Sequence, residues 1–99
     1  MYARVTYDPI QPVKIDNAIK VEQDSILSAA QVEKGFKGLF FLTNRDTGKG
    51  MTISLWETEA DMKQAEASGY YREQIAKLIP LSSGPAVKEH YEVCVQNLT

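Results

Sequence analysis

The chain has 99 residues and a net charge of −2 at pH 7, and these two numbers exclude several classes of protein. A chain of this length has room for one modest core, so we expect a single domain over residues 1–99. Charged residues make up 24% of the chain but form no basic cluster, and binding to phosphate groups needs clustered Lys and Arg. We therefore expect neither nucleic acid nor an anionic membrane surface as a partner.

Cysteine usage and the start of the chain favour the cytoplasm. Cys94 is the only cysteine, so no intrachain disulfide can form. Residues 1–5 lack the apolar core of a signal peptide, and no apolar run approaches the roughly 20 residues of a membrane span. A reducing compartment fits these observations.

The first third of the chain predicts a strand followed by a long helix. Residues 2–7 are rich in β-branched and aromatic side chains and run up to Asp8-Pro9, which predicts a strand. Residues 12–32 predict a helix that opens at Pro12 and is closed by Gly35. Its apolar stripe consists of Ile15, Ala18, Ile19, Ile26, Ala29 and Ala30.

Glu22 and Gln23 interrupt this stripe, and the interruption has two interpretations. In the first, both side chains lie at the edge of the stripe and extend their polar ends into water. In the second, a polar group points into a cavity.

Residues 36–56 predict a β-hairpin. Two strands, 36–43 and 50–56, flank the polar turn 44–49, in which Gly48 supplies a positive φ. If Thr43 pairs with Gly50, alternate residues of the two strands share a face. One face then carries Phe40, Leu42, Met51, Ile53 and Leu55, and the other carries Leu39, Phe41, Thr52, Ser54 and Trp56.

The remaining elements complete a βαββαβ order. Thr58 predicts the start of a second helix, which Ser68-Gly69 interrupts and Pro80 ends. Residues 87–96 alternate between apolar and polar and predict the last strand. This order is typical of a ferredoxin-like α+β fold, with a four-stranded antiparallel sheet and helices on one face.

The hairpin also predicts an oligomer. The strand at 36–43 is apolar on both faces, yet one layer of helices covers only one face of a sheet. A second copy of the chain is the simplest cover for the other face, so we predict a homodimer.

Three short motifs resemble those of the antibiotic biosynthesis monooxygenase family, which belongs to the dimeric α/β-barrel superfamily. They are Gly-Phe-Lys-Gly at 35–38, Leu-Trp-Glu-Thr at 55–58 and Ser-Gly-Tyr-Tyr at 68–71. The resemblance spans nearly the whole chain and implies a dimeric α/β barrel with a ligand pocket between each sheet and its helices. It also implies two activities found among members: oxidation of aromatic polyketides or quinols with O₂ and no cofactor, and degradation of bound haem.

The chain departs from both catalytic patterns that the resemblance implies. Where the polyketide oxygenases have an asparagine and a tyrosine near the strand tryptophan, this chain has Thr52 and Met62. Where the haem-degrading members have a tryptophan and a histidine, it has Ala65 and Ile75. We therefore expect no haem and no other cofactor, and we assign no catalytic residue.

Candidate ligand-binding residues lie on the hairpin, after the helix break and on the last strand. Trp56 is either a core residue with a satisfied indole N–H or the wall of a pocket for a planar substrate. Arg4 is a candidate for holding a substrate carboxylate or phenolate, although we favour an intermolecular salt bridge. No second histidine or cysteine lies at ligand spacing, so we expect no metal site. The full set of candidates is Trp56, Phe41, Thr52, Ser54, Tyr70 and His90.

His90 is the only histidine, and its role is open. Its polar neighbours favour a solvated position or a sheet edge, and the alternative is a general base.

Two functions from different classes remain open. The first is a cofactor-independent monooxygenase that acts on or binds a small planar aromatic molecule, polyketide- or quinol-like, which Trp56 and Phe41 would orient. The second is a non-catalytic dimeric module that binds a small apolar or aromatic molecule or has a regulatory role. The residues at Thr52 and Met62 favour the second.

Overall fold

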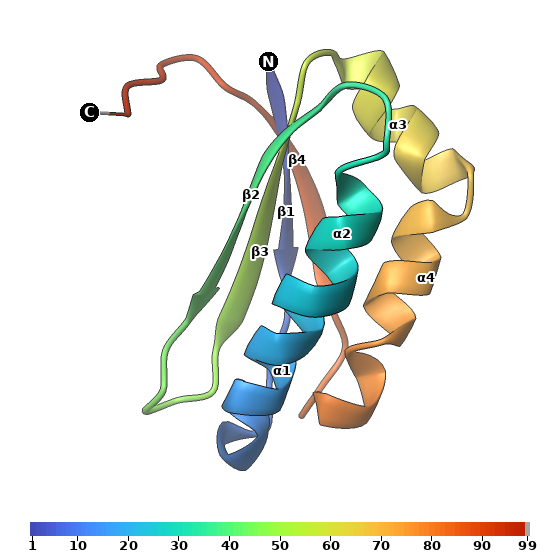
Figure 1. Ribbon diagram of the computed structural model, residues 1–99. Helices are drawn as coiled ribbons and strands as arrows, with labels where there is room; N and C mark the ends of the chain where they lie inside the picture. The colour runs from blue at the N-terminus through green and yellow to red at the C-terminus, as the bar shows by residue number, and fades with distance from the viewer. Residues whose placement is uncertain (99) are drawn as a thin grey trace.

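The computed structural model describes residues 1–98 as a four-stranded antiparallel sheet with its helices on one face (Figure 1). β2 and β3 form the predicted hairpin, and β1 pairs with both β3 and β4. The order across the sheet is β2-β3-β1-β4, which confirms the predicted ferredoxin-like α+β fold. The strands are β1 (Tyr2–Tyr7), β2 (Phe36–Thr43), β3 (Gly50–Trp56) and β4 (Val87–Glu92).

The first helical arm leads from the end of β1 to the start of β2 as one nearly continuous helix. It ends at Ala30 rather than at residue 32, because the Glu33 N–H turns back to the Ala30 carbonyl at 3.0 Å. Gly35 lies in the turn beyond, where a Cβ would clash with the Asp61 side chain. The segments of this arm are η1 (Pro12–Lys14), α1 (Ile15–Val21), η2 (Glu22–Ile26) and α2 (Leu27–Ala30).

The second helical arm consists of α3 (Glu59–Ala67), α4 (Tyr70–Ala76) and the short η3 (Ile79–Leu81). The Thr58 hydroxyl oxygen accepts the Asp61 backbone N–H at 3.0 Å and caps α3, as predicted. Ser68 and Gly69 separate α3 from α4, so the predicted break is confirmed. No helix within residues 1–98 is long and apolar enough to cross a membrane.

β4 is shorter than predicted and ends at Glu92 rather than at residue 96. Its partner β1 begins at Tyr2, which pairs with Glu92. Beyond this point one further bond forms, from the Val93 N–H to the Met1 carbonyl at 2.9 Å. The alternating pattern therefore continues past the end of the strand that could pair with it.

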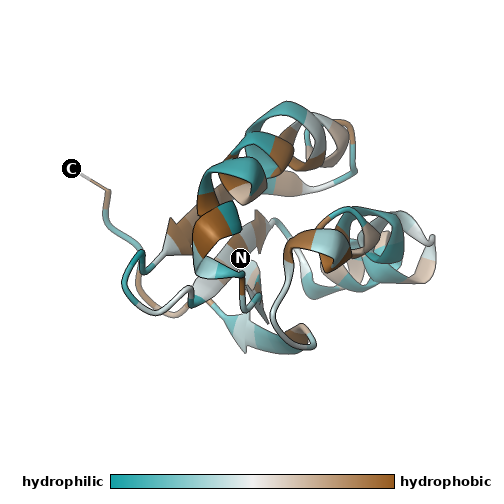
Figure 2. Cartoon of the chain, turned by 90° about the horizontal axis from the view of Figure 1, so that it is seen from below, coloured by the Kyte–Doolittle hydropathy of each residue, from teal (hydrophilic) through white to brown (hydrophobic). Residues whose placement is uncertain are grey.

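Two clusters form the core between the sheet and the helical arms, which lie on the same side of the sheet (Figures 1 and 2). The first is built from the first arm and the end of the second and contains Ile10, Ile15, Ala18, Ile26 and Leu78. The second lies at the opposite end of the sheet and contains Trp56, Met62 and Ala65.

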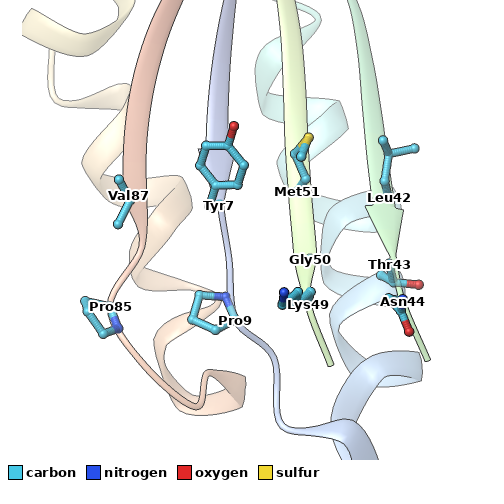
Figure 3. Close-up of a pocket in the computed structure, with 10 residues that line it drawn as sticks. All are labelled: Tyr7, Pro9, Leu42, Thr43, Asn44, Lys49, Gly50, Met51, Pro85 and Val87. Atoms are coloured by element: carbon cyan, nitrogen blue, oxygen red, sulfur yellow. The ribbon is translucent and has the colours of Figure 1, made fainter. Parts of the chain in front are cut away.

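The other face of the sheet is apolar and open. The register pairs Thr43 with Gly50, as predicted, so the hairpin residues divide between the two faces as expected. One row on the open face crosses all four strands as Leu42, Met51, Tyr7 and Val87 (Figure 3). These side chains line a shallow hollow of about 630 Å³. Phe40 and Leu42 are 44% and 48% exposed, so this chain alone leaves the face in water.

Gly48→Ala should destabilise the fold more than Gly69→Ala. Both glycines have positive φ, +80° and +89°, a conformation that costs other residues roughly 1–2 kcal/mol. At Gly48 an added Cβ would also clash with the Ile10 carbonyl oxygen, whereas nothing lies within 4 Å at Gly69. Thermal unfolding followed by circular dichroism should show the larger fall in Tm for Gly48→Ala. Equal falls would mean that the turn moves away from Ile10 at no cost.

Candidate functional site

A small polar cavity lies between the sheet and the helical arms. Its volume is about 30 Å³, enough for about one or two water molecules. β1 and β3 form its floor, and η2 and α4 form its roof. We call it the inner cavity; its lining residues are Arg4, Thr6, Glu22, Ile26, Leu39, Thr52, Ser54, Tyr70, Tyr71, Gln74 and Ile75.

Three of the predicted ligand-binding residues line the inner cavity. Thr52 and Ser54 project into it from β3, and Tyr70 reaches it from the first turn of α4. Burial raises the pKa of Tyr70 to about 12, so its phenol is neutral at physiological pH.

Trp56 lies behind the inner cavity rather than in its wall. The side chain is fully buried, with 0% exposure, against Met62 and Ala65. Its indole N–H donates to the Ser54 hydroxyl at 2.9 Å, and its ring forms a T-shaped pair with Phe36 at 5.6 Å between ring centroids. Trp56 is therefore a core residue that fixes the orientation of a hydroxyl in the cavity wall.

Phe41 lies in a second hollow, lined by the first helical arm and β2. This hollow has a volume of about 280 Å³ and an apolar wall. It shares Glu22 and Leu39 with the inner cavity, so these side chains border both spaces. We call it the β2 groove; its lining residues are Ile19, Glu22, Gln23, Leu27, Leu39, Phe41 and Thr43.

His90 lies at the sheet edge, away from the inner cavity. Its Nε2 is 2.7 Å from the Glu66 carboxylate, which also pairs with Lys88 at 2.7 Å and with Arg4 at 3.3 Å. Burial opposes the ionisation of Glu66, but the bonds from Lys88, His90 and Arg4 outweigh it and hold the pKa of Glu66 below its usual value.

Arg4 forms an intramolecular salt bridge, so the predicted intermolecular one is wrong. The side chain is 4% exposed, and its guanidinium carbon lies 4.4 Å from the centre of the Tyr71 ring and 5.2 Å from that of Trp56. Arg4 alternates on β1 with Thr6, whose hydroxyl is 2.9 Å from the Tyr71 hydroxyl. These aromatic contacts hold a positive charge at one side of the inner cavity.

Two buried carboxyl groups are joined by one hydroxyl: Glu22 and Thr52 line the inner cavity, and Asp8 lines a separate hollow beside Leu78 and Ser82. The Thr52 Oγ1 lies 2.8 Å from Glu22 Oε1 and 3.0 Å from Asp8 Oδ2. A hydroxyl has one hydrogen, so it can donate to only one of these oxygens. The other bond forms only when its carboxyl is protonated and donates to Thr52.

The pKa values of both carboxyl groups fit this shared proton. Asp8 and Glu22 are 2% and 3% exposed. Burial raises the pKa of Asp8 to about 6 and, together with the negative charge of Asp8, raises that of Glu22 to about 7, against the lowering effect of the Thr52 bonds. The pair of carboxyl groups therefore gains or loses a proton near neutral pH.

The local helix geometry places Glu22 in this position. Glu22 opens η2, a single π-helical turn in which the Leu27 N–H donates to the Glu22 carbonyl. Turns of this type occur frequently at functional sites. Of the two interpretations of the interrupted stripe, the structure confirms the polar group in a cavity for Glu22, while Gln23 is exposed.

A spacing in the sequence marks Glu22 as buried. It lies four residues after Ala18 and four before Ile26, both of which are buried. Asp8 carries no comparable signal, because Asp-Pro after a strand is an ordinary turn pattern. Within residues 1–98 no group of three potential metal ligands clusters.

Sequence comparison gives relatives without a known activity. No protein-family model matches the chain. The uncharacterized proteins MT2635 and Rv2558, from two strains of Mycobacterium tuberculosis, are each 29% identical over 96 residues, which is 96% of this chain. The chain spans only 39% of the length of these relatives.

Structural comparison finds proteins of the same fold as this chain. The monooxygenase ActVA-Orf6 of Streptomyces coelicolor, solved in complex with nanaomycin D, has a TM-score of 0.73 and 16% identity over 99% of this chain and 91% of its own. SnoaB, a cofactor-independent oxygenase from Streptomyces nogalater, has a TM-score of 0.73 and 14% identity over 96% and 94%. An antibiotic biosynthesis monooxygenase has a TM-score of 0.73 and 12% identity over 96% and 100%. The chain has the fold of the antibiotic biosynthesis monooxygenases.

This confirms the resemblance read from the motifs at the level of the antibiotic biosynthesis monooxygenase fold. Identities this low carry no residue roles, so the site has to be argued from the side chains present. Thr52, which stands where the resemblance implies an asparagine in polyketide oxygenases, here joins two carboxyl groups.

Glu22→Gln should raise the stability near pH 8 and change it little near pH 5. The folded-state pKa of about 7 lies above the usual 4.5, so the folded chain binds more protons than the unfolded chain between these values. The contribution of Glu22 is therefore fully present below about pH 4.5 and is lost as the pH rises through about 7. We expect Glu22→Gln to recover roughly 2 kcal/mol of unfolding free energy at the higher pH.

Urea unfolding at several pH values measures this effect. Asp24→Asn removes an exposed carboxyl from the same turn and serves as the matched control. Parallel pH profiles for wild type and Glu22→Gln would contradict a buried carboxyl that titrates near neutral pH.

Proposed function

We propose that the chain binds a small planar aromatic molecule, polyketide- or quinol-like, between the sheet and the helical arms and oxygenates it with O₂ without a cofactor. The observation that carries this proposal is a polar inner cavity next to the apolar β2 groove, with Glu22 and Leu39 in the lining of both. Such a pairing suits a ligand with flat apolar rings and a few polar substituents. The fold likeness to SnoaB and ActVA-Orf6 supports the proposal without assigning the activity to this chain.

The proposed oxygenation requires few catalytic groups from the protein. When a dihydroxynaphthalene reacts with O₂ to give a hydroxynaphthoquinone, one oxygen atom enters the ring and the other leaves as water. The substrate supplies all four electrons, so neither a metal nor a flavin is consumed. The protein has to bind and orient the rings, exclude water and accept a proton, and a buried cavity with hydroxyl and carboxyl groups meets these needs.

A binding module without catalysis is the second candidate function. Thr52 and Met62 favour it, because they replace the asparagine and tyrosine that the resemblance implies for polyketide oxygenases. The two candidates agree on the ligand class and differ only in whether O₂ is consumed.

1,4-Dihydroxynaphthalene should quench the fluorescence of Trp56 saturably. Trp56 is the only tryptophan, and its indole N–H is bonded to Ser54 in the cavity wall, so a ligand hydroxyl that enters the inner cavity and contacts Ser54 perturbs the emission. Mass spectrometry after reaction under ¹⁸O₂ should find one labelled oxygen atom in the ring. Background oxidation is measured without protein.

The outcomes separate the candidates. Saturable quenching with no labelled product above background would leave the binding module as the function. No change in emission, together with no binding heat in calorimetry at millimolar ligand, would contradict both.

We also propose that two copies pair through their open sheet faces. The rows on this face are apolar across β2, β3 and β1, and Glu89 on β4 is a charged residue at the edge of one row. Phe40, Leu42 and Tyr91 are each more than two-fifths exposed. A small domain gains stability when such a face is removed from water.

Light scattering behind a sizing column should therefore give about twice the chain mass of 11.1 kDa. Phe40→Glu should shift the mass to that of a monomer, because two carboxylates would be buried in the pair. Val13→Glu, at a site on η1 that is 88% exposed, is the matched control and should leave the mass unchanged. A monomeric wild type at micromolar concentration would contradict the pairing.

A further inference from the structure

One buried carboxyl oxygen has no hydrogen-bond partner among residues 1–98. Glu22 Oε1 is bonded to Thr52, but Glu22 Oε2 has no hydrogen-bond partner within the described residues. Roughly 90% or more of buried polar groups in folded proteins have one. An unpartnered oxygen on a side chain that is 3% exposed is therefore a specific feature that needs an explanation.

The position of Glu22 supplies the explanation. Its side chain lines both the inner cavity and the β2 groove. Oε2 itself is covered in this structure, so a ligand reaches it only when the Glu22 side chain turns toward the groove. Leu39 and Phe41 present apolar surface beside it on β2. A molecule whose rings lie in the β2 groove would bring a substituent on the ring edge to this oxygen.

We propose that Glu22 Oε2 is the acceptor for the hydroxyl group of a hydroxyaromatic ligand whose rings lie in the β2 groove against Leu39 and Phe41. This assignment rests on the proposed function and adds to it the contact residue, the groove and the substituent. A carboxylate accepts such a bond more strongly than a neutral oxygen does, and the bond satisfies the unpartnered atom.

The groove also sets the size of the ligand. Its volume of about 280 Å³ lies at the lower limit of pockets that bind drug-sized molecules, roughly 300–1,000 Å³. The inner cavity of about 30 Å³ admits a hydroxyl or a water molecule and no ring. We therefore assign a ligand of one or two fused rings rather than a tetracyclic one.

The same contact can move a proton. When the hydroxyl is acidic enough, its O–H bond breaks, a new O–H bond forms on Glu22 Oε2, and the electron pair stays on the ligand as an aryloxide. The groups that face Glu22 are Asp8 and Arg4 from β1 and its end, Thr52 from β3, and Tyr70 and Tyr71 from α4. Arg4 lines the inner cavity, where its charge is paired with Glu66.

2-Naphthol and its methyl ether test the assignment, because they share the rings and differ in the O–H donor. Wild type should bind 2-naphthol at least about tenfold more tightly, as expected for a bond to a charged acceptor. Glu22→Leu should bind both with the same Kd, and Glu22→Gln should show a reduced preference. Gln23→Leu, an exposed residue that also lines the groove, is the matched control and should keep the preference.

Two further measurements locate the rings and the charge. Phe41→Ala should weaken both ligands by a similar factor, because it removes groove wall and leaves Glu22 intact. The preference of wild type for 2-naphthol should increase as Glu22 ionises around its pKa of about 7, and Glu22→Gln should show no such increase. Circular dichroism confirms that each variant is folded.

Each outcome supports or overturns a stated part. Equal affinity of wild type for the two ligands, with weaker binding by Phe41→Ala, would overturn the role of Glu22 and leave the proposed function standing. If Phe41→Ala does not weaken binding, the assignment of the rings to the β2 groove is overturned. Failure of wild type to bind either ligand at millimolar concentration would overturn the proposed function itself.

Discussion

The hydroxyl of Thr52 holds two buried carboxyl groups together, and much of the site follows from its single hydrogen. Because Thr52 cannot donate to both Glu22 and Asp8, the complete set of bonds requires one protonated carboxyl. Burial provides this state by raising both pKa values toward neutrality. The pair thus holds a proton, and Glu22 is the member that lines both the inner cavity and the β2 groove. Its cost is a fold that becomes less stable as the pH rises through about 7.

Alternate residues of each strand face opposite sides of the sheet, so the residues of the inner cavity are separated from those of the surface proposed for a second copy. Side chains that face the helical arms include Arg4, Thr6, Thr52 and Ser54, while those between them along the strands face the opposite, apolar side. A slip of one residue in register would bring the polar set to the open face and the apolar set under the helices. The pairing of Thr43 with Gly50 therefore fixes both the inner cavity and the surface proposed for a second copy.

Features set by short-range patterns could be predicted from the sequence, and features set by long-range contacts could not. The hairpin register, the cap at Thr58 and the break at Gly69 depend on a few neighbouring residues and are confirmed. The end of β4 depends on where β1 begins, so the alternating pattern of β4 alone predicted too long a strand. The salt-bridge partner of Arg4 lies on a helix far along the chain, so the sequence of β1 alone did not indicate it. The site divides in the same way. Alternation placed Thr52 and Ser54 on one face, but nothing local indicated that Asp8 and Glu22 would meet across Thr52.

Burial of Glu22 is difficult to explain by structure alone. A leucine or methionine at this position would extend the stripe of Ala18 and Ile26 and would avoid the cost of a buried carboxyl group. A carboxyl that served only to fix Thr52 would need one oxygen, yet the second oxygen is also buried and lacks a partner within the described residues. The π-helical turn adds a further departure from the most stable helix, and it begins at the same residue. The buried carboxyl group, the unpartnered oxygen and the π-helical turn are three unfavourable features at one position, beside an apolar groove and a cavity. A ligand that supplies the missing donor accounts for all three.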